Sequence, residues 1–227
     1  MKIGALNLKP VVRPFSPVEK QPKAAFKAQY DSFDFSGNFI KSVNDREPPL
    51  IELNRPMQLE ELFLMIVKSQ NPAVEKIFLR KAFDKATLSG YMTDFLYFPE
   101  EISNMKIKNL YDLGCFALVF ETQDGKILKI GEGSHFPEDR KPEDFDVPVE
   151  KSGKGRFLHY YVEQKCSVDD VSEEEILDLC KYIKSKGFLL IDVNLMNGSL
   201  KKEQFGRGKD GKIYLLDPQC AIKRSIC

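Results

Sequence analysis

The sequence is poor in the residues that most often build metal sites and acid–base sites. Its two histidines, His135 and His159, are too few to favour a histidine-ligated metal or a histidine general base. Its five cysteines are scattered and odd in number, without the paired spacing of zinc ligands or of a disulfide framework. This pattern favours reduced thiols and a cytoplasmic setting.

The sequence also lacks an excess of either charge. Lys+Arg and Asp+Glu number 34 each, so the composition gives no reason to expect nucleic acid as a partner. No apolar run reaches about 18 residues, so no membrane span is predicted, and the first 20 residues lack the apolar core of a signal peptide. With 42% hydrophobic and 30% charged residues, the chain of 227 residues is expected to form one domain with an appendage.

The first fifty residues differ from the rest because prolines interrupt them. Prolines at positions 10, 14, 17, 22, 48 and 49 break most potential helices, and lysines and small residues fill the gaps. We expect residues 1–50 to form a mobile, Pro-rich N-terminal arm, with secretion or docking onto a partner as the alternative role.

Residues 51–107 show the period of helices. Apolar residues recur at helical spacing after Pro56, a residue that suits the first turn of a helix. A second helical run covers 74–85 and ends at Ser89-Gly90. The pattern predicts a small helical unit over 51–107. The apolar face of its first helix consists of Leu59, Leu62, Phe63, Ile66 and Val67.

From residue 108 onward the pattern changes to that of strands. Two β-rich runs flank Asp124-Gly125, which is a strong hairpin signal, and a second hairpin is expected around 152–155. A helix is expected from Ser172, with acidic residues in its first turn, to Gly187. Short strands then flank a glycine-rich turn at 206–211. The fold class predicted for residues 108–227 is α+β.

Three residues in this part suit phosphoryl transfer. Asp192 and Asn197 stand five positions apart, and Asp217 ends the apolar run that begins at Ile213. Phosphoryl transfer depends on positioning and charge neutralisation, and Mg²⁺ prefers oxygen ligands such as those of Asn197 and Asp217. Asp192 could accept the proton of a hydroxyl group, and Lys129 could place a positive charge against phosphates. Ordinary turn chemistry also explains an Asp and an Asn at this spacing.

The order of these elements resembles that of the protein-kinase-like superfamily, in a truncated and atypical form. The run 113–120 is similar to a shortened glycine-rich loop, and 162–166 is similar to the hinge that borders adenine. The resemblance implies a reduced kinase-like fold with a β-rich N-lobe and a short C-lobe, and ATP and Mg²⁺ as cofactors. It assigns catalysis to Asp192, nucleotide binding to Gly114, Cys115, Phe116, Ala117, Lys129, Glu163 and Lys165, and the metal to Asn197 and Asp217.

The sequence also departs from that family. The loop keeps one glycine, Gly114, and Asn194 stands where protein kinases carry a lysine that helps to neutralise the γ-phosphate. The segment after Lys129 is too proline-broken for the helix that usually supplies a glutamate to this lysine. Either this pair is missing or the glutamate comes from elsewhere, with Glu75 as the first candidate donor and Glu60 and Glu61 behind it. No activation segment or peptide-docking helices are expected in the ten residues after Asp217.

Three functions therefore stay open. The first is a compact phosphotransferase that uses Mg·ATP and transfers phosphate to an unidentified acceptor, either a protein or a small molecule. Similar small kinase-like domains occur in bacterial effectors and phage polyvalent proteins, which implies the cytoplasm or, after secretion, a host cytosol. The second is a pseudokinase that binds proteins without turnover, and the third is an unrelated α+β interaction protein.

Overall fold

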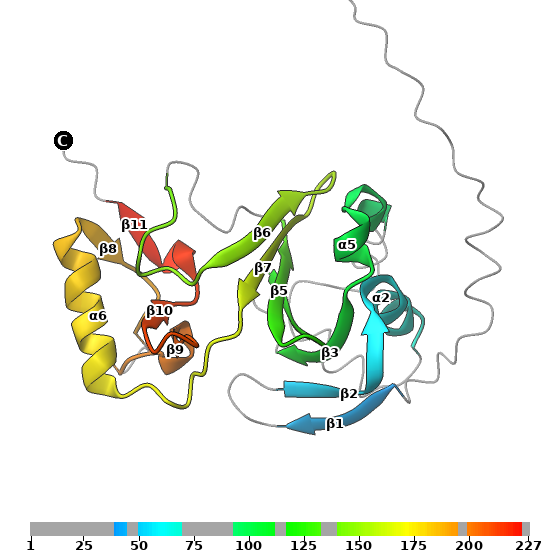
Figure 1. Ribbon diagram of the computed structural model, residues 1–227, viewed down its shortest axis with the longest axis horizontal. Coiled ribbons are helices and arrows are strands. Elements are labelled where there is room, and N and C mark those ends of the chain that lie inside the picture. The colour runs from blue at the N-terminus through cyan, green and yellow to red at the C-terminus, as the bar shows by residue number, and fades with distance from the viewer. Residues whose placement is uncertain are drawn as a thin grey trace, which may run out of the picture. The chain divides into compact units, whose positions relative to one another are not determined.

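The computed structural model describes residues 39–44, 50–69, 93–111, 117–132, 140–194 and 199–223 (Figure 1). All of them belong to one compact unit, Asp34–Cys227. Several predictions therefore lie outside the described residues: the arm over 1–38, the helix over 74–85 with Glu75, and the site residues Gly114, Cys115, Phe116 and Asn197.

The described chain has a mixed α+β fold in which an antiparallel sheet dominates. The sheet has seven strands in the order β1-β2-β3-β4-β5-β7-β6. Two smaller sheets, each of two strands, lie in the C-terminal part. No helix in the described ranges is long and apolar enough to cross a membrane. The strands of the large sheet are β1 (Ile40–Asn44), β2 (Leu50–Gln58), β3 (Lys106–Tyr111), β4 (Ala117–Thr122), β5 (Lys126–Gly131), β6 (Val149–Lys154) and β7 (His159–Gln164).

The start of the predicted helical unit is a strand, and the end of the predicted arm also holds one. Strand β2 includes Pro56, and the predicted helix, α2 (Leu59–Lys68), begins only after Gln58. The pairing of β2 with β3 shifts register between Glu52 and Met57, and proline is tolerated at such an irregularity. Strand β1 pairs with β2, so residues 40–44 belong to the sheet.

The helices beside the sheet bury aromatic residues. Phe63 of α2 is fully buried, and its ring centroid lies 4.6 Å from that of Phe95 and 6.0 Å from that of Phe120 on β4. Phe95 belongs to η1 (Thr93–Tyr97), which precedes the short helix α5 (Glu100–Ser103). Of the predicted apolar face, Leu59, Leu62, Phe63 and Ile66 are buried and Val67 is half-buried. Burial extends beyond this stripe of the helix, because Glu61, Leu64 and Met65 are buried as well.

The hairpin of β6 and β7 turns later than expected. Strand β6 continues through 152–154, and the turn lies at 155–158. The carboxylate of Asp94, which has no exposed surface, accepts hydrogen bonds from the backbone N–H groups of Arg156 and Leu158, at 2.5 and 2.6 Å. It also accepts one from the N–H of Phe157. A side chain 62 residues away therefore helps to fix this turn.

Replacing Asp94 with alanine is expected to lower the free energy of unfolding by about 2–3 kcal/mol, because buried backbone donors lose their acceptor. Denaturant unfolding measures the change. Asp178→Ala, which removes an exposed carboxylate from the helix surface, is the matched control and should change stability by less than about 0.5 kcal/mol. Equal effects of the two substitutions would contradict the capping role of Asp94.

The C-terminal part confirms the predicted helix. Helix α6 (Glu173–Ser185) begins at Ser172, whose side chain forms a reciprocal capping box with Glu175. Ile176, Cys180 and Ile183 are buried along one face of this helix. The remaining elements are β8 (Phe188–Leu190), η2 (Lys202–Gln204), β9 (Phe205–Arg207), β10 (Ile213–Leu215), η3 (Pro218–Cys220) and β11 (Ala221–Lys223). Strand β9 pairs with β10, and β8 pairs with β11.

Candidate functional site

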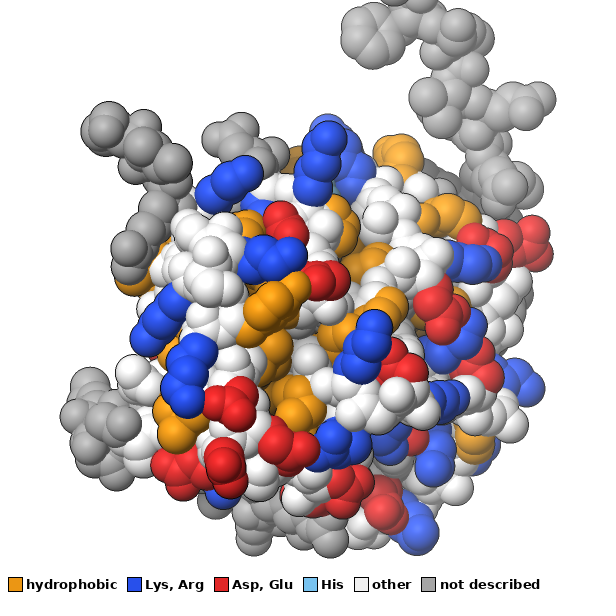
Figure 2. Space-filling model, turned by 60° about the vertical axis from the view of Figure 1, so that its left-hand side comes forward, with side chains coloured by type: hydrophobic (Ala, Val, Ile, Leu, Met, Phe, Trp, Pro, Cys, Tyr) orange, Lys and Arg blue, Asp and Glu red, His pale blue; other side chains and the backbone are white. Residues whose placement is uncertain are grey.

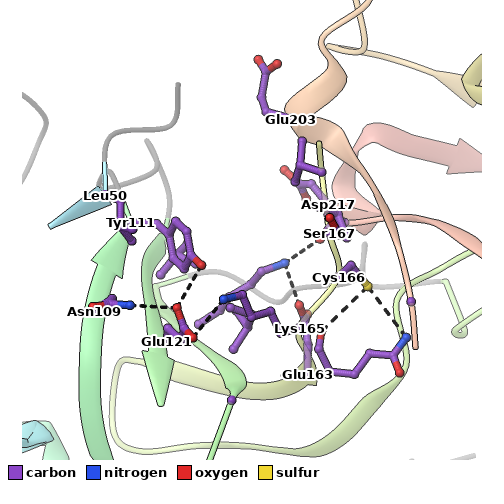
Figure 3. Close-up of a pocket in the computed structure, with 18 of the residues that line it drawn as sticks. Leu50, Asn109, Tyr111, Glu121, Glu163, Lys165, Cys166, Ser167, Glu203 and Asp217 are labelled. Atoms are coloured by element: carbon purple, nitrogen blue, oxygen red, sulfur yellow. Dashed lines mark hydrogen bonds and ion pairs between the residues drawn. The ribbon is translucent and has the colours of Figure 1, made fainter. Parts of the chain in front are cut away.

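A cleft of about 1600 Å³ lies along one face of the large sheet. Alternate residues of β4 and β5 line it, as the period of a β-strand requires. Residues 203–219 complete its lining, and Asp217 is among them. Figure 3 shows side chains from both parts around this space. The lining includes Ala117, Val119 and Glu121 of β4, Ile127 and Lys129 of β5, Tyr161 and Glu163 of β7, and Lys165.

Lys129 links the sheet to the residue before Asp217. Its ammonium nitrogen lies 2.9 Å from Oε2 of Glu163 and donates a hydrogen bond of 2.5 Å to the carbonyl oxygen of Leu216. Both side chains of the ion pair are shielded, since 14% of Lys129 and 2% of Glu163 is exposed. A positive charge is thereby held beside the strand end that carries Asp217.

The structure gives Lys129 a partner that the sequence analysis did not propose for it. This partner is Glu163, which the sequence assigned to nucleotide binding, whereas Glu75, the expected donor, lies outside the described residues. Lys129 pairs in register with Tyr161, so Glu163 is its diagonal neighbour on the adjacent strand, within reach of a long side chain. Glu60 and Glu61 were the other predicted partners of Lys129, and Glu61 instead forms an ion pair with Arg55.

The loop after Asp217 is held by a buried cluster. Asp217 caps η3 by accepting a hydrogen bond of 3.0 Å from the backbone N–H of Gln219. Arg140 donates to the carbonyl oxygen of Pro218 and to the carboxylate of Asp146, and both partners of this ion pair are buried. The Arg140 guanidinium also lies 5.1 Å from the ring centroids of Phe145 and Phe188. These contacts tie the irregular segment 140–147 to the loop that presents Asp217.

A second polar group in the cleft surrounds Glu121. Its carboxylate accepts hydrogen bonds from Asn109 and Lys165, both at 2.9 Å, and from the hydroxyl group of Tyr111 at 3.2 Å (Figure 3). Burial raises the pKa of Glu121, but the hydrogen bonds from Asn109 and Lys165 outweigh it and hold that pKa below its ordinary value. Lys165, predicted to bind nucleotide, is therefore committed to a neighbouring carboxylate.

Asp192 lies outside the cleft lining. It has a left-handed backbone, with φ at 53°, and its side chain is 64% exposed and bound by the ammonium of Lys201. Its neighbour Ile191 nevertheless lies beside the loop after Asp217, because the N–H of Ile191 donates a hydrogen bond of 2.8 Å to the carbonyl oxygen of Cys220. Burial raises the pKa of Cys220 to about 12, and the negative charges of Asp217 and Asp192 add to this rise.

The described residues offer a partial set of ligands for Mg²⁺. Asp217 supplies a carboxylate in the cleft, which suits this cation. Within the described ranges, no group of three or more His, Cys, Asp and Glu side chains is arranged to hold a metal ion. The other predicted ligand, Asn197, lies outside these ranges.

The structure thus brings five of the predicted site residues to one cleft: Ala117, Lys129, Glu163, Lys165 and Asp217. Sequence reasoning missed Glu121, Tyr111 and the pair of Arg140 with Asp146. The roles of Glu121 and Arg140 depend on their contacts with the distant residues Lys165 and Pro218. Figure 2 shows acidic and basic side chains on the same face of the molecule, with hydrophobic side chains exposed between them. No known family model matches the chain, and no curated protein matches it.

Proposed function

We propose that this chain is an ATP-dependent phosphotransferase with a reduced protein-kinase-like fold. The observation that carries the proposal is the position of Lys129, whose ammonium binds Glu163 and the carbonyl oxygen of Leu216, directly before Asp217. A fixed cation next to a carboxylate at a strand end is the arrangement that a magnesium–nucleotide complex requires.

The order of the elements supports the same proposal. Lys129 lies in the hairpin of β4 and β5, and the hairpin of β6 and β7, helix α6 and strand β8 follow. Asp192 comes next, and Asp217 directly follows the hairpin of β9 and β10. This is the order expected from the resemblance to protein kinases.

Each residue has a separate role in the proposed reaction. Lys129 binds phosphate oxygens, and the apolar side chains of Ala117, Val119 and Ile127 offer a surface for the base. Asp217, together with Asn197, would hold Mg²⁺, which when bound neutralises charge on the phosphates. Asp192 orients the acceptor hydroxyl and takes its proton. A cytoplasmic setting, or a host cytosol after secretion, goes with this proposal.

A pseudokinase that binds proteins is the second candidate. The ammonium of Lys129 is already engaged by Glu163 and by Leu216, and Tyr161 lines the cleft beside it. Asp192 is outside the lining, so the catalytic groups do not all meet in this conformation. These contacts favour the pseudokinase, because Glu163 and the carbonyl oxygen of Leu216 already bind the ammonium that would contact a phosphate.

Calorimetry with Mg·ATP tests the nucleotide site on which the first candidate depends. The wild-type chain is expected to bind saturably, and Asp217→Asn to weaken binding at least about tenfold, a loss of about 1.4 kcal/mol. Asparagine removes the charge but keeps an oxygen that can cap Gln219, so the loop should stay folded. Asp178→Asn, on the surface of α6, is the control and should bind as the wild type does. Absence of wild-type binding at millimolar Mg·ATP would refute the nucleotide site.

A further inference from the structure

The pairing of Asp192 with Lys201 differs from an ordinary surface ion pair. In the pair of Lys181 with Asp178 on α6, the side chains are 76% and 67% exposed. In the pair at Asp192, the lysine is 21% exposed and only the carboxylate is open to solvent, at 64%. The ammonium thus lies against the protein, and the carboxylate faces outward. Such a pair leaves the acid accessible to a ligand while fixing the cation beside it.

The backbone holds Lys201 in this position. Its N–H donates a hydrogen bond of 2.9 Å to the carbonyl oxygen of Val193, the residue after Asp192. The neighbouring residues Asn194 and Leu200 form an antiparallel bridge. On its other side, the carbonyl oxygen of Lys201 accepts from the N–H of Gln204 at 3.1 Å. These hydrogen bonds join the segment around Val193 to the segment around Lys201 and so hold Lys201 beside Asp192.

The backbone at Asp192 adds a second, independent observation. Among the described residues, Asp192 is the one non-glycine residue with a positive φ, at 53°. Such conformations are uncommon for residues with a side chain, and they concentrate at functional sites. The backbone N–H of Ile191 donates to the carbonyl oxygen of Cys220 at 2.8 Å, which anchors this turn beside the loop after Asp217.

We propose that Lys201 contacts the transferring phosphoryl group and positions Asp192 for the acceptor hydroxyl. The inference rests on the proposed phosphotransferase activity. The sequence leaves Asn194 where protein kinases carry a phosphate-neutralising lysine, and the structure supplies a lysine from position 201. Without it, the charge of Asp192 would repel the phosphate that must approach it.

The proposed reaction transfers the γ-phosphoryl group of ATP to an acceptor hydroxyl. The hydroxyl oxygen forms a bond to the γ-phosphorus, and the bond from that phosphorus to the β–γ bridging oxygen breaks. ADP leaves with the electron pair, and the hydroxyl proton passes to the carboxylate of Asp192. Lys201 is not consumed, and its ammonium offsets negative charge on the γ-phosphoryl oxygens while its hydrogen bond orients Asp192.

Turnover of Mg·ATP by the full chain tests this role, with phosphate transfer to the chain itself, to water and to a mixed Ser/Thr/Tyr peptide library as readouts. Lys201→Met is expected to lower kcat about 100-fold, the usual cost of losing one charge-stabilising donor. The calorimetric Kd for Mg·ATP should change less than about threefold, because Lys129 and Asp217 still bind the nucleotide. Lys201→Arg should restore kcat to within about tenfold of the wild type, since it keeps the charge.

Lys202→Met, at the neighbouring exposed lysine, is the matched control and should keep wild-type turnover. The inference is overturned if Lys201→Met retains kcat within about twofold of the wild type. It is also overturned if the Arg variant is as impaired as the Met variant, because a purely structural contact would then explain the loss. A wild-type chain that binds Mg·ATP without any transfer would overturn this inference and leave the nucleotide site standing. A wild-type chain without binding would remove both proposals.

Discussion

Replacing Arg140 with methionine is expected to lower the free energy of unfolding by about 3–5 kcal/mol, among the largest effects of any single substitution in this chain. The substitution leaves the buried carboxylate of Asp146 without its guanidinium partner. It also removes the donor to the carbonyl oxygen of Pro218 and the cation beside the rings of Phe145 and Phe188. For a chain of this length, the melting temperature should fall by roughly 10 °C.

Thermal and denaturant unfolding of matched variants test this cluster. Lys181→Ala breaks an exposed ion pair and should change stability by less than about 1 kcal/mol. The double variant Arg140→Met with Asp146→Leu should recover much of the loss, because it buries no unpaired charge. If the double variant is less stable than Arg140→Met alone by a further 3 kcal/mol or so, the penalty does not come from an unpaired carboxylate.

Local signals predicted several elements well. The turn at Asp124-Gly125 and the helix start at Ser172 depend on residues only a few positions apart, and both are present. Strand β2 was missed because helical spacing after Pro56 obscured the alternation of buried Ile51 and Leu53. The late turn of the second hairpin depends on Asp94, whose carboxylate reaches it from another part of the chain.

The candidate site also combines residues that local patterns identify with contacts that depend on distant segments. Lys129 and Asp217 could be predicted because each stands in a run with a clear strand pattern. The pairing of Lys129 with Glu163 requires the register between β5 and β7, which are separated in the sequence by residues 132–148 and by β6. Likewise, Lys201 reaches Asp192 only because the backbone at Val193 pairs with it. Contacts set by register between distant segments are not encoded in local periodicity.

Replacing Lys129 with methionine is expected to abolish phosphate transfer, with kcat/KM at least about 10³-fold lower than in the wild type. The variant loses the cation held by the carbonyl oxygen of Leu216, directly before Asp217, and removes the lysine that pairs with the buried Glu163. Glu163→Gln should lower kcat/KM about 10- to 100-fold, because the lysine keeps its charge but loses the carboxylate that aims it. Steady-state kinetics with Mg·ATP measure both effects, at a temperature well below the unfolding transition of each variant.

Lys165→Met is the informative control, because it removes a cation that lines the same cleft but is bound to Glu121. Its effect on kcat should be at least about tenfold smaller than that of Lys129→Met, if position relative to Asp217 and not cleft charge decides the rate. The double variant Lys129→Met with Glu163→Leu also removes the carboxylate that has lost its lysine and so separates lost stability from lost catalysis. If that variant is stable and still inactive, Lys129 acts on the phosphates. If Lys129→Met retains transfer, the lysine serves the fold alone and does not bind the phosphates.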